Sequence, residues 1–267
     1  MNGMTMDLSS LTAVVTGGTS GIGLATVRLL LARGARVALC ARDPQRLEEV
    51  TATLAAEGHG DRVLAHPCDV VVESQVQAFS KAVEQRFGGV DVLVNNAGRA
   101  RVSTFSDTSD ADWHEELTLK FFSVIYPVRA FLPALKRSPH AAVVCVNSLL
   151  ALQPEPHMVA TSAARAGVQN LVRSLAVEFA PFAIRVNSVL LGTVDSGQWQ
   201  ARYAKRAAAG ETFEQWLANL AREKKIPLGR FGRSEEAAQA IVFLASPLSS
   251  YTTGTSIDVS GGTARFI

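Results

Sequence analysis

Three glycines near the start of the chain have the spacing of a loop that can hold a phosphate group. They lie in Thr16-Gly-Gly-Thr-Ser-Gly-Ile-Gly23, after an apolar run and before a helical pattern. Glycine lets the backbone approach a diphosphate closely, and a helix start supplies amide donors and a positive dipole end. A glycine-rich turn without a ligand is the alternative, but the position after a first strand favours binding. The residues we assign to this cradle are Gly17, Thr19, Ser20, Gly21, Ile22 and Gly23.

The end of the next apolar run indicates which dinucleotide such a cradle would hold. An acidic residue at this place accepts hydrogen bonds from the ribose 2′-hydroxyl of NAD(H) and repels a 2′-phosphate. The chain has Ala41-Arg42 there, and an arginine can pair with a phosphate through two hydrogen bonds. We therefore predict a preference for NADP(H). NAD(H) stays the alternative if Arg42 is only a solvated charge at a helix start.

Short apolar runs alternate with helical patterns along the 267 residues. This alternation predicts parallel strands joined by right-handed crossovers. The predicted fold class is α/β: a single-domain Rossmann fold, with a doubly wound parallel sheet of about seven strands and helices on both faces. The predicted strands are Ala13–Val15, Arg36–Cys40, Val63–His66, Val90–Val94, Ala142–Asn147, Ile184–Val189 and Thr255–Val259. The predicted helices are Gly23–Arg33, Pro44–Glu57, Glu73–Phe87, Asp110–Lys136, Ala160–Phe179 and Ser234–Leu244.

The segment 192–233 departs from this alternation. Connections of this length are uncommon in compact domains unless they form lids or binding loops. Phe213, Trp216, Leu217 and Leu220 have helical spacing, so we expect one or two helices here. We interpret the segment as a lid over a substrate site, inserted within a single domain of residues 1–267.

Four further motifs, in the same order along the chain, resemble those of the short-chain dehydrogenase/reductase family. They are Cys68-Asp-Val70, Asn95-Asn-Ala-Gly98, Leu191-Gly-Thr-Val194 and Ile257-Asp-Val-Ser-Gly-Gly262. The resemblance implies an adenine contact at Asp69, a ribose contact at the Asn95 segment and a nicotinamide contact near Val194. Leu191 replaces the family's usual proline and leaves its loop less rigid. The cofactor residues added in this way are Asp69, Val70, Asn95, Ala97, Gly98, Gly192 and Val194.

The positions that carry the family's chemistry are altered in this chain. Members usually have Asn, Ser, Tyr and Lys at the reactive centre, the last two as Y-x-x-x-K on one helix face. Ser148 matches the serine, whereas Lys120, Thr161 and Arg165 stand at the other three positions. Arg165 can still bind ribose hydroxyls, but a threonine hydroxyl is far too weak an acid to replace a phenol. The usual proton relay is therefore excluded.

Two residues are candidates for the missing acid. Lys120 would lie near Arg165, and a like charge together with burial lowers the pKa of a lysine towards neutrality. His157, four residues before Thr161, has a near-neutral pKa as a free side chain. A surface lysine and a loop histidine without a role are the plain alternatives. Tyr203, in the predicted lid, is out of register with the family's tyrosine.

The first hypothesis is therefore an NADP(H)-dependent oxidoreductase with a non-standard acid, acting on a carbonyl or alcohol. A second is a cofactor-binding sensor or partner subunit with little turnover, and a third is a non-redox enzyme that keeps the cofactor. Lys120 and Arg165 together favour an anionic small-molecule substrate, to which Arg99 and Arg101 could add.

Composition excludes several other classes. Lys plus Arg is 26 and Asp plus Glu is 24, so the net charge of +2 does not suggest a nucleic-acid partner. The histidines lack metal-ligand spacing, and three cysteines without pairing signals fit a reducing cytoplasm. The apolar stretch from Phe121 to Leu135 is interrupted by Pro127 and Pro133 and is too short to span a membrane.

The resemblance also implies a homodimer or homotetramer, in which the predicted helices Asp110–Lys136 and Ala160–Phe179 pair between subunits. An apolar stripe on the second of them is a candidate for this contact, unless it only covers the sheet. The stripe consists of Val168, Leu171, Val172, Leu175 and Phe179.

Overall fold

A seven-stranded parallel sheet forms the centre of the computed structural model, which describes residues 6–195, 197–206 and 210–266. The strand order is β3-β2-β1-β4-β5-β6-β7, so the direction of winding reverses between β1 and β4. Ligands of such sheets bind beyond the carboxyl ends of the strands at this reversal. The strands are β1 Thr12–Thr16, β2 Arg36–Ala41, β3 Val63–Pro67, β4 Val92–Asn95, β5 Ala142–Ser148, β6 Arg185–Leu191 and β7 Ser256–Val259.

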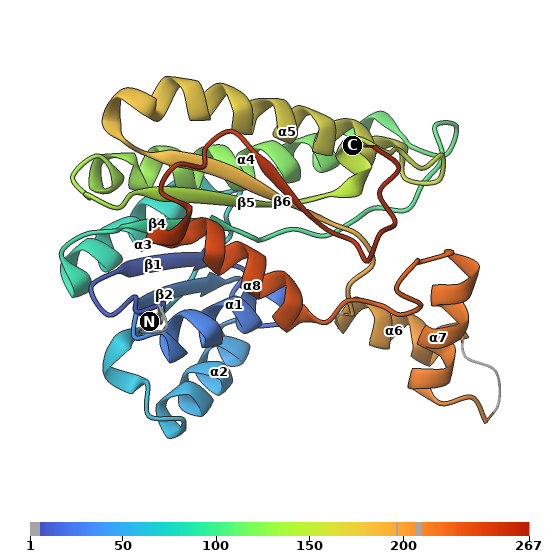
Figure 1. Ribbon diagram of the computed structural model, residues 1–267, viewed down its shortest axis with the longest axis horizontal. Coiled ribbons are helices and arrows are strands. Elements are labelled where there is room, and N and C mark those ends of the chain that lie inside the picture. Colours follow the sequence, from blue (N-terminus) through green and yellow to red (C-terminus); the bar gives the residue numbers. More distant parts are fainter. Residues whose placement is uncertain (1–5, 196, 207–209, 267) are drawn as a thin grey trace, which may run out of the picture.

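Helices cover both faces of the sheet (Figure 1). One core, which includes Phe79, Phe131 and Val172, lies under α3, α4 and α5, and the other, which includes Leu30 and Ile241, lies under α1 and α8. Both faces are apolar because parallel strands with helices on each side have no solvent-exposed surface. The helices are α1 Gly21–Ala32, α2 Pro44–Ala56, α3 Glu73–Phe87, α4 Asp110–Leu135, α5 Val159–Phe179, α6 Gly197–Arg206, α7 Phe213–Glu223 and α8 Ser234–Ala245.

The predicted fold class is confirmed, and every predicted strand and helix is present with ends that differ by a few residues. Helix α4 includes Pro127 and Pro133, as the predicted range Asp110–Lys136 implies, and neither proline ends it. Packing against α3 and α5 keeps the helix continuous. Within the described residues, α4 is also long and apolar enough to cross a membrane by length and composition alone, a test that core helices of soluble proteins pass as well.

The apolar stripe of α5 covers the sheet, which was the alternative interpretation, and a subunit contact through this helix stays a prediction. Val168, Val172 and Phe179 are buried in the core below α3 and α4, and Leu171 and Leu175 pack against it. A stripe at helical spacing serves the nearest apolar surface, and here that surface is the chain's own sheet. Val177 is instead 77% exposed.

The segment 192–233 contains two helices, α6 and α7, which stand apart from the sheet in Figure 1. Aromatic side chains join them: the ring centroids of Trp199 and Trp216 are 6.1 Å apart, and those of Trp199 and Phe231 are 4.9 Å apart. The ring of Tyr203 belongs to the same cluster, and its hydroxyl donates to the Glu211 carbonyl at 2.5 Å. Tyr203 is therefore held within the insertion.

Asn96 ties the glycine-rich loop to the end of β4. Its side-chain amide donates to the carbonyls of Thr16 at 2.9 Å and Gly17 at 3.1 Å. Its backbone N–H donates to the Thr16 hydroxyl at 3.0 Å. These bonds fix the loop at the point where the sheet reverses its winding.

Replacing Asn96 by Asp should therefore destabilise the protein by ~1–3 kcal/mol, because a carboxylate would face two carbonyl oxygens that have lost their donor. Thermal unfolding followed by circular dichroism measures the effect. Asn170→Asp, at an exposed position of α5, is the matched control and should change stability by less than ~0.5 kcal/mol. Equal melting temperatures for Asn96→Asp and wild type would contradict this role of Asn96.

Candidate functional site

The turn between β1 and α1 has the geometry of a phosphate cradle. Gly17 and Gly21 have φ angles of +67° and +50°, a region that glycine enters without strain. A Cβ at Gly23 would collide with the Gly17 carbonyl. The N-cap of α1 is Ser20, and within the described residues no side chain caps the helix and no acid lies in its first turn. The amides at this helix start thus fit a diphosphate.

The end of β2 presents two cations beside this cradle. Arg42 is exposed directly after the strand. Arg46, one turn into α2, donates from Nε to the Thr19 carbonyl at 3.3 Å. Asp43 is committed to helix capping, since its carboxylate accepts from the Arg46 N–H at 3.2 Å. The sequence analysis did not identify Arg46 as a candidate phosphate ligand, because its spacing is the same as that of a solvated charge on a helix.

The motifs after β3 and β4 make hydrogen bonds within the chain. The Asp69 carboxylate accepts from the Val71 N–H at 3.1 Å, and Val70 is buried. Asn95 points into the sheet, where its amide lies 3.8 Å from the Cys145 Sγ. The side chain of Asn95 is buried, and Asn96 makes the hydrogen bonds from this segment to the glycine-rich loop. Ala97 donates its N–H to the Thr16 hydroxyl at 3.0 Å.

A group of polar residues, here called the charged cluster, joins α4 to α5; three of its members are buried, and Arg165 is half-buried. It consists of Glu116, Lys120, Thr161 and Arg165. The Lys120 ammonium lies 2.8 Å from the Glu116 Oε1 and also donates to the Arg99 carbonyl. The Thr161 hydroxyl donates to the same Glu116 Oε1 at 2.5 Å. Glu116, Lys120 and Thr161 are 2%, 3% and 1% exposed, so water is nearly excluded from these contacts.

Arg165 connects the charged cluster to the edge of the sheet. Its Nη1 donates to the Val146 carbonyl at 2.8 Å, near the end of β5. Its Nη2 lies 3.8 Å from the position that a Cβ on Gly98 would take. Its buried Nε has no hydrogen-bond partner within the described part of the chain. Nη2, beside the motif after β4, suits a hydroxyl of a bound dinucleotide ribose.

Electrostatics in the charged cluster depend on burial and on neighbouring charges. Burial, followed by the charge of Arg165, lowers the pKa of Lys120 to about 8, although Glu116 opposes the shift. Burial also lowers the pKa of Arg165 to about 10, with Glu116 again opposing. The predicted proximity of Lys120 and Arg165 is confirmed by this interaction. A lysine with a pKa near 8 can exchange a proton at physiological pH.

The other residues at positions that resemble the family's motifs lie around the ends of β5 and β6. The Ser148 hydroxyl donates to the Leu191 carbonyl at 3.3 Å and accepts from the Leu150 N–H at 3.3 Å. A Cβ at Gly192 would come within 2.7 Å of the Ser260 Cβ, so the two loops touch closely. Val194 is buried and forms a β-bridge with Gly232.

The side chains of three other candidate residues, His157, Arg99 and Arg101, lie against acidic side chains. The His157 ring lies 3.1 Å from the Glu155 carboxylate and is 56% exposed, away from the charged cluster. Arg99 and Arg101 both pair with Glu115, and Arg101 also pairs with Asp112 at 2.6 Å. These partners weaken the positive field on which the prediction of an anionic substrate relied.

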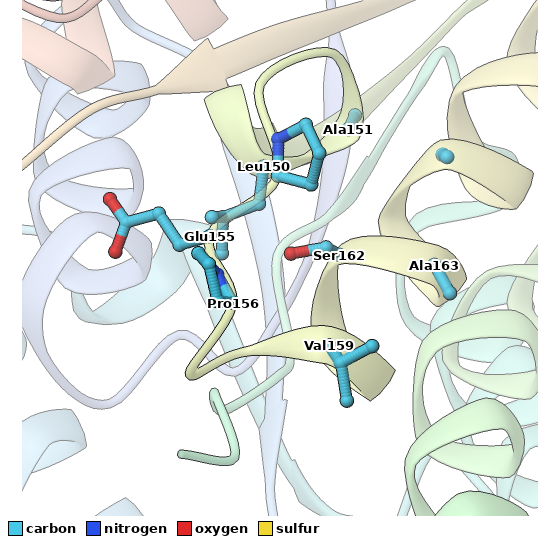
Figure 2. A pocket seen from close by; sticks show the side chains of 9 residues that line it. Leu150, Ala151, Glu155, Pro156, Val159, Ser162 and Ala163 are labelled. Carbon is cyan, nitrogen blue, oxygen red and sulfur yellow. The ribbon is translucent and has the colours of Figure 1, made fainter. Parts of the chain in front are cut away.

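A cavity of about 430 Å³ lies between the start of α5 and the segment that follows β5 (Figure 2). Its walls are mainly apolar, and Leu150 and Ala151, which follow Ser148 closely, contribute to them. The buried Ser162 hydroxyl points towards Leu150 and Pro156 and has no hydrogen-bond partner within the described residues. None of the charged-cluster residues lines this space.

Glu116 is the member of the charged cluster that the sequence analysis did not single out. The signal available was its spacing of four residues from Lys120, which places both on one helix face. Such pairs are common on solvated helix surfaces, and only the packing of α5 onto α4 makes this one buried.

Comparison with known proteins identifies relatives over nearly the full chain. A family model described as enoyl-(acyl carrier protein) reductase matches residues 17–264. A short chain oxidoreductase from Pseudomonas aeruginosa PAO1, described as containing an atypical catalytic center, is 61% identical. Its apo structure has a TM-score of 0.95, covering 98% of this chain and 100% of that one. An NADPH-bound structure of the same description has a TM-score of 0.94, covering 98% and 99%.

More distant relatives have the same fold. L-Sorbose reductase from Gluconobacter frateurii, solved with NADPH and L-sorbose, is 31% identical with a TM-score of 0.93, covering 99% of this chain and 100% of that one. The 3-oxoacyl-acyl-carrier-protein reductase of Thermotoga maritima is 32% identical over 260 residues, covering 96% of this chain and 99% of that protein. With the sheet order, the glycine-rich turn and the family model, these matches show that the chain belongs to the short-chain dehydrogenase/reductase family.

Proposed function

We propose that the protein is an NADP(H)-dependent oxidoreductase that transfers hydride between the nicotinamide and a carbonyl or alcohol substrate. The observation that carries the proposal is the uncapped start of α1 at the same sheet edge as Arg165. The Pseudomonas oxidoreductase was solved with NADPH bound, and the sorbose reductase with NADPH and L-sorbose. Both findings support this cofactor and this reaction class.

Residues along the sheet edge fit successive parts of the dinucleotide. The amides of the Gly17–Gly23 turn would hold the diphosphate, and Arg42 and Arg46 the 2′-phosphate. Arg165 would donate from the Nη2 of its guanidinium to the nicotinamide ribose. The dinucleotide, when bound, supplies or accepts the hydride. Binding of the diphosphate requires no rearrangement of α1, since the helix start already lacks a capping side chain among the described residues.

Lys120 is the residue we propose as the proton donor in reduction. Its ammonium has three N–H groups, of which two are directed to Glu116 and to the Arg99 carbonyl. The third is left for the substrate oxygen or for a water that leads to it. Ser148, at the end of β5, is proposed to bind the same substrate oxygen. Its present acceptor, the Leu191 carbonyl, is 3.3 Å away.

A second candidate function is a dinucleotide-binding protein with little or no turnover. The observation that favours it is the state of Thr161, whose hydroxyl donates to Glu116 and accepts from the Arg101 N–H at 3.1 Å. A hydroxyl held in this way has no proton to give to a substrate. NADPH binding without oxidation across a broad panel of carbonyl compounds would favour this function.

The substrate lid and the assembly are proposals of the same kind. The insertion with α6 and α7 follows β6 directly, at the sheet edge where the nicotinamide would lie, and its position supports a role in covering the substrate. A homodimer or homotetramer is proposed from family resemblance, with the exposed face of α5 around Val177 in place of the buried stripe.

Replacing Arg42 by Ala should weaken NADPH binding at least ~10-fold, because a charge-assisted bond to phosphate is lost, and should leave NADH binding nearly unchanged. Calorimetric titration of both dinucleotides measures the difference. Arg137→Ala, an exposed cation paired with Glu84, is the control. An equal loss for both dinucleotides would contradict the role of Arg42, and no affinity for either would refute the proposed function.

Replacing Lys120 by Met should abolish carbonyl reduction while NADPH binding is retained. In the wild type, the rate of reduction should fall as the pH rises through about 8, because the donor is the protonated ammonium. Loss of NADPH absorbance across a pH series tests both statements. Lys81→Met, at an exposed position, serves as the control. Undiminished turnover in Lys120→Met would eliminate this residue as the acid.

A further inference from the structure

We propose that Glu116 is a positioning residue that keeps Lys120 in its charged form, directs its ammonium, and locks the Thr161 hydroxyl out of proton transfer. The inference deepens the proposed function and rests on it for the link to turnover. Glu116 lies at none of the positions that the family resemblance assigned to chemistry. Its place in the charged cluster alone suggests the role.

One carboxylate oxygen of Glu116 accepts hydrogen bonds from two donors. Oε1 lies 2.8 Å from the Lys120 Nζ and 2.5 Å from the Thr161 Oγ1. Lys120 stands one turn after Glu116 on α4, and Thr161 lies in the first turn of α5. The carboxylate therefore fixes the ammonium and the hydroxyl relative to each other across two helices.

The Thr161 hydroxyl has a single proton and can donate only one hydrogen bond. The Arg101 N–H donates to this oxygen, and the Arg101 carbonyl lies 3.2 Å from it. The contact to Glu116 is the shortest of the three and is charge-assisted, so the proton resides there. Thr161 thus lies at the family's tyrosine position, but its hydroxyl connects α5 to α4 through the hydrogen bond to Glu116.

Charges of both signs surround the Lys120 ammonium. Arg165 on α5 and Arg99 before α4 both disfavour its ammonium, and Glu116 on α4 favours it. The more distant acids Glu115 and Asp112 are paired with Arg99 and Arg101 at the surface. Glu116 is thus the carboxylate among the described residues that contacts the ammonium, and without it two cations would face each other in a site with little water.

The test is Glu116→Gln, which preserves the shape and an acceptor for Thr161 but removes the charge. The pKa of Lys120 should fall by at least ~1 unit from its wild-type value, since a buried opposite charge at this distance shifts a pKa by ~1–3 units. Carbon-13 NMR of protein labelled at the lysine ε-carbons measures this directly. The chain has six lysines, Lys81, Lys120, Lys136, Lys205, Lys224 and Lys225, and Lys120→Met assigns the signal.

Glu115→Gln is the matched control, because Glu115 is the adjacent residue, is half-exposed and pairs with the surface arginines Arg99 and Arg101. It should leave the titration of Lys120 within ~0.3 units, since an exposed charge is screened by solvent. In Glu116→Gln the alkaline fall of the reduction rate should move to lower pH together with the Lys120 titration, while NADPH affinity stays within about twofold.

The outcomes separate this inference from the proposed function. A lowered titration of Lys120 without any turnover would support the role of Glu116 and refute hydride transfer. An unchanged titration in a folded, NADPH-binding Glu116→Gln protein would overturn the inference. If this variant does not fold, Glu116→Asp replaces it: the retained but withdrawn charge should lower the pKa of Lys120 by a smaller amount, and an unchanged value would overturn the inference equally.

Discussion

Two cations, Lys120 and Arg165, share one buried carboxylate, that of Glu116. Removing charged groups from water is costly, and such a group is tolerated only when Coulomb attraction and hydrogen bonds offset the loss of hydration. Here the Glu116 oxygen, the Arg99 carbonyl and the Val146 carbonyl provide that compensation. The arrangement leaves an excess of one positive charge at the carboxyl end of the sheet. The position of every polar side chain in the charged cluster follows from this requirement.

The parallel sheet places the charged cluster and the phosphate cradle in one region. Strands that run in the same direction end at the same edge, so the loop after β1, the motif after β4 and the end of β5 are neighbours. Asn96 joins the first two of these loops, and Arg165 joins the last two. Asn96 and Arg165 thus connect these loops through backbone carbonyls at the end of the sheet.

Much of the architecture could be predicted from the sequence because apolar periodicity and glycine spacing are local signals. The cradle after β1, the strands and the altered positions Lys120, Thr161 and Arg165 all follow from such patterns. Glu116 did not, because its environment is created by α5, which lies about forty residues further along the chain. The stripe on α5 left two interpretations open for a related reason: an apolar helix face has the same pattern whether it covers a sheet or a second subunit. Tertiary packing decides both cases.

The aromatic cluster of the insertion has an optical consequence. The protein has three tryptophans, and two of them, Trp199 and Trp216, stand with their rings 6.1 Å apart on α6 and α7. Excitation absorbed by either indole can be exchanged between them at this separation, and the guanidinium of Arg202 lies 4.6 Å from the Trp199 ring. The fluorescence of these two tryptophans is therefore expected to respond to the packing of the two helices, without any attached dye.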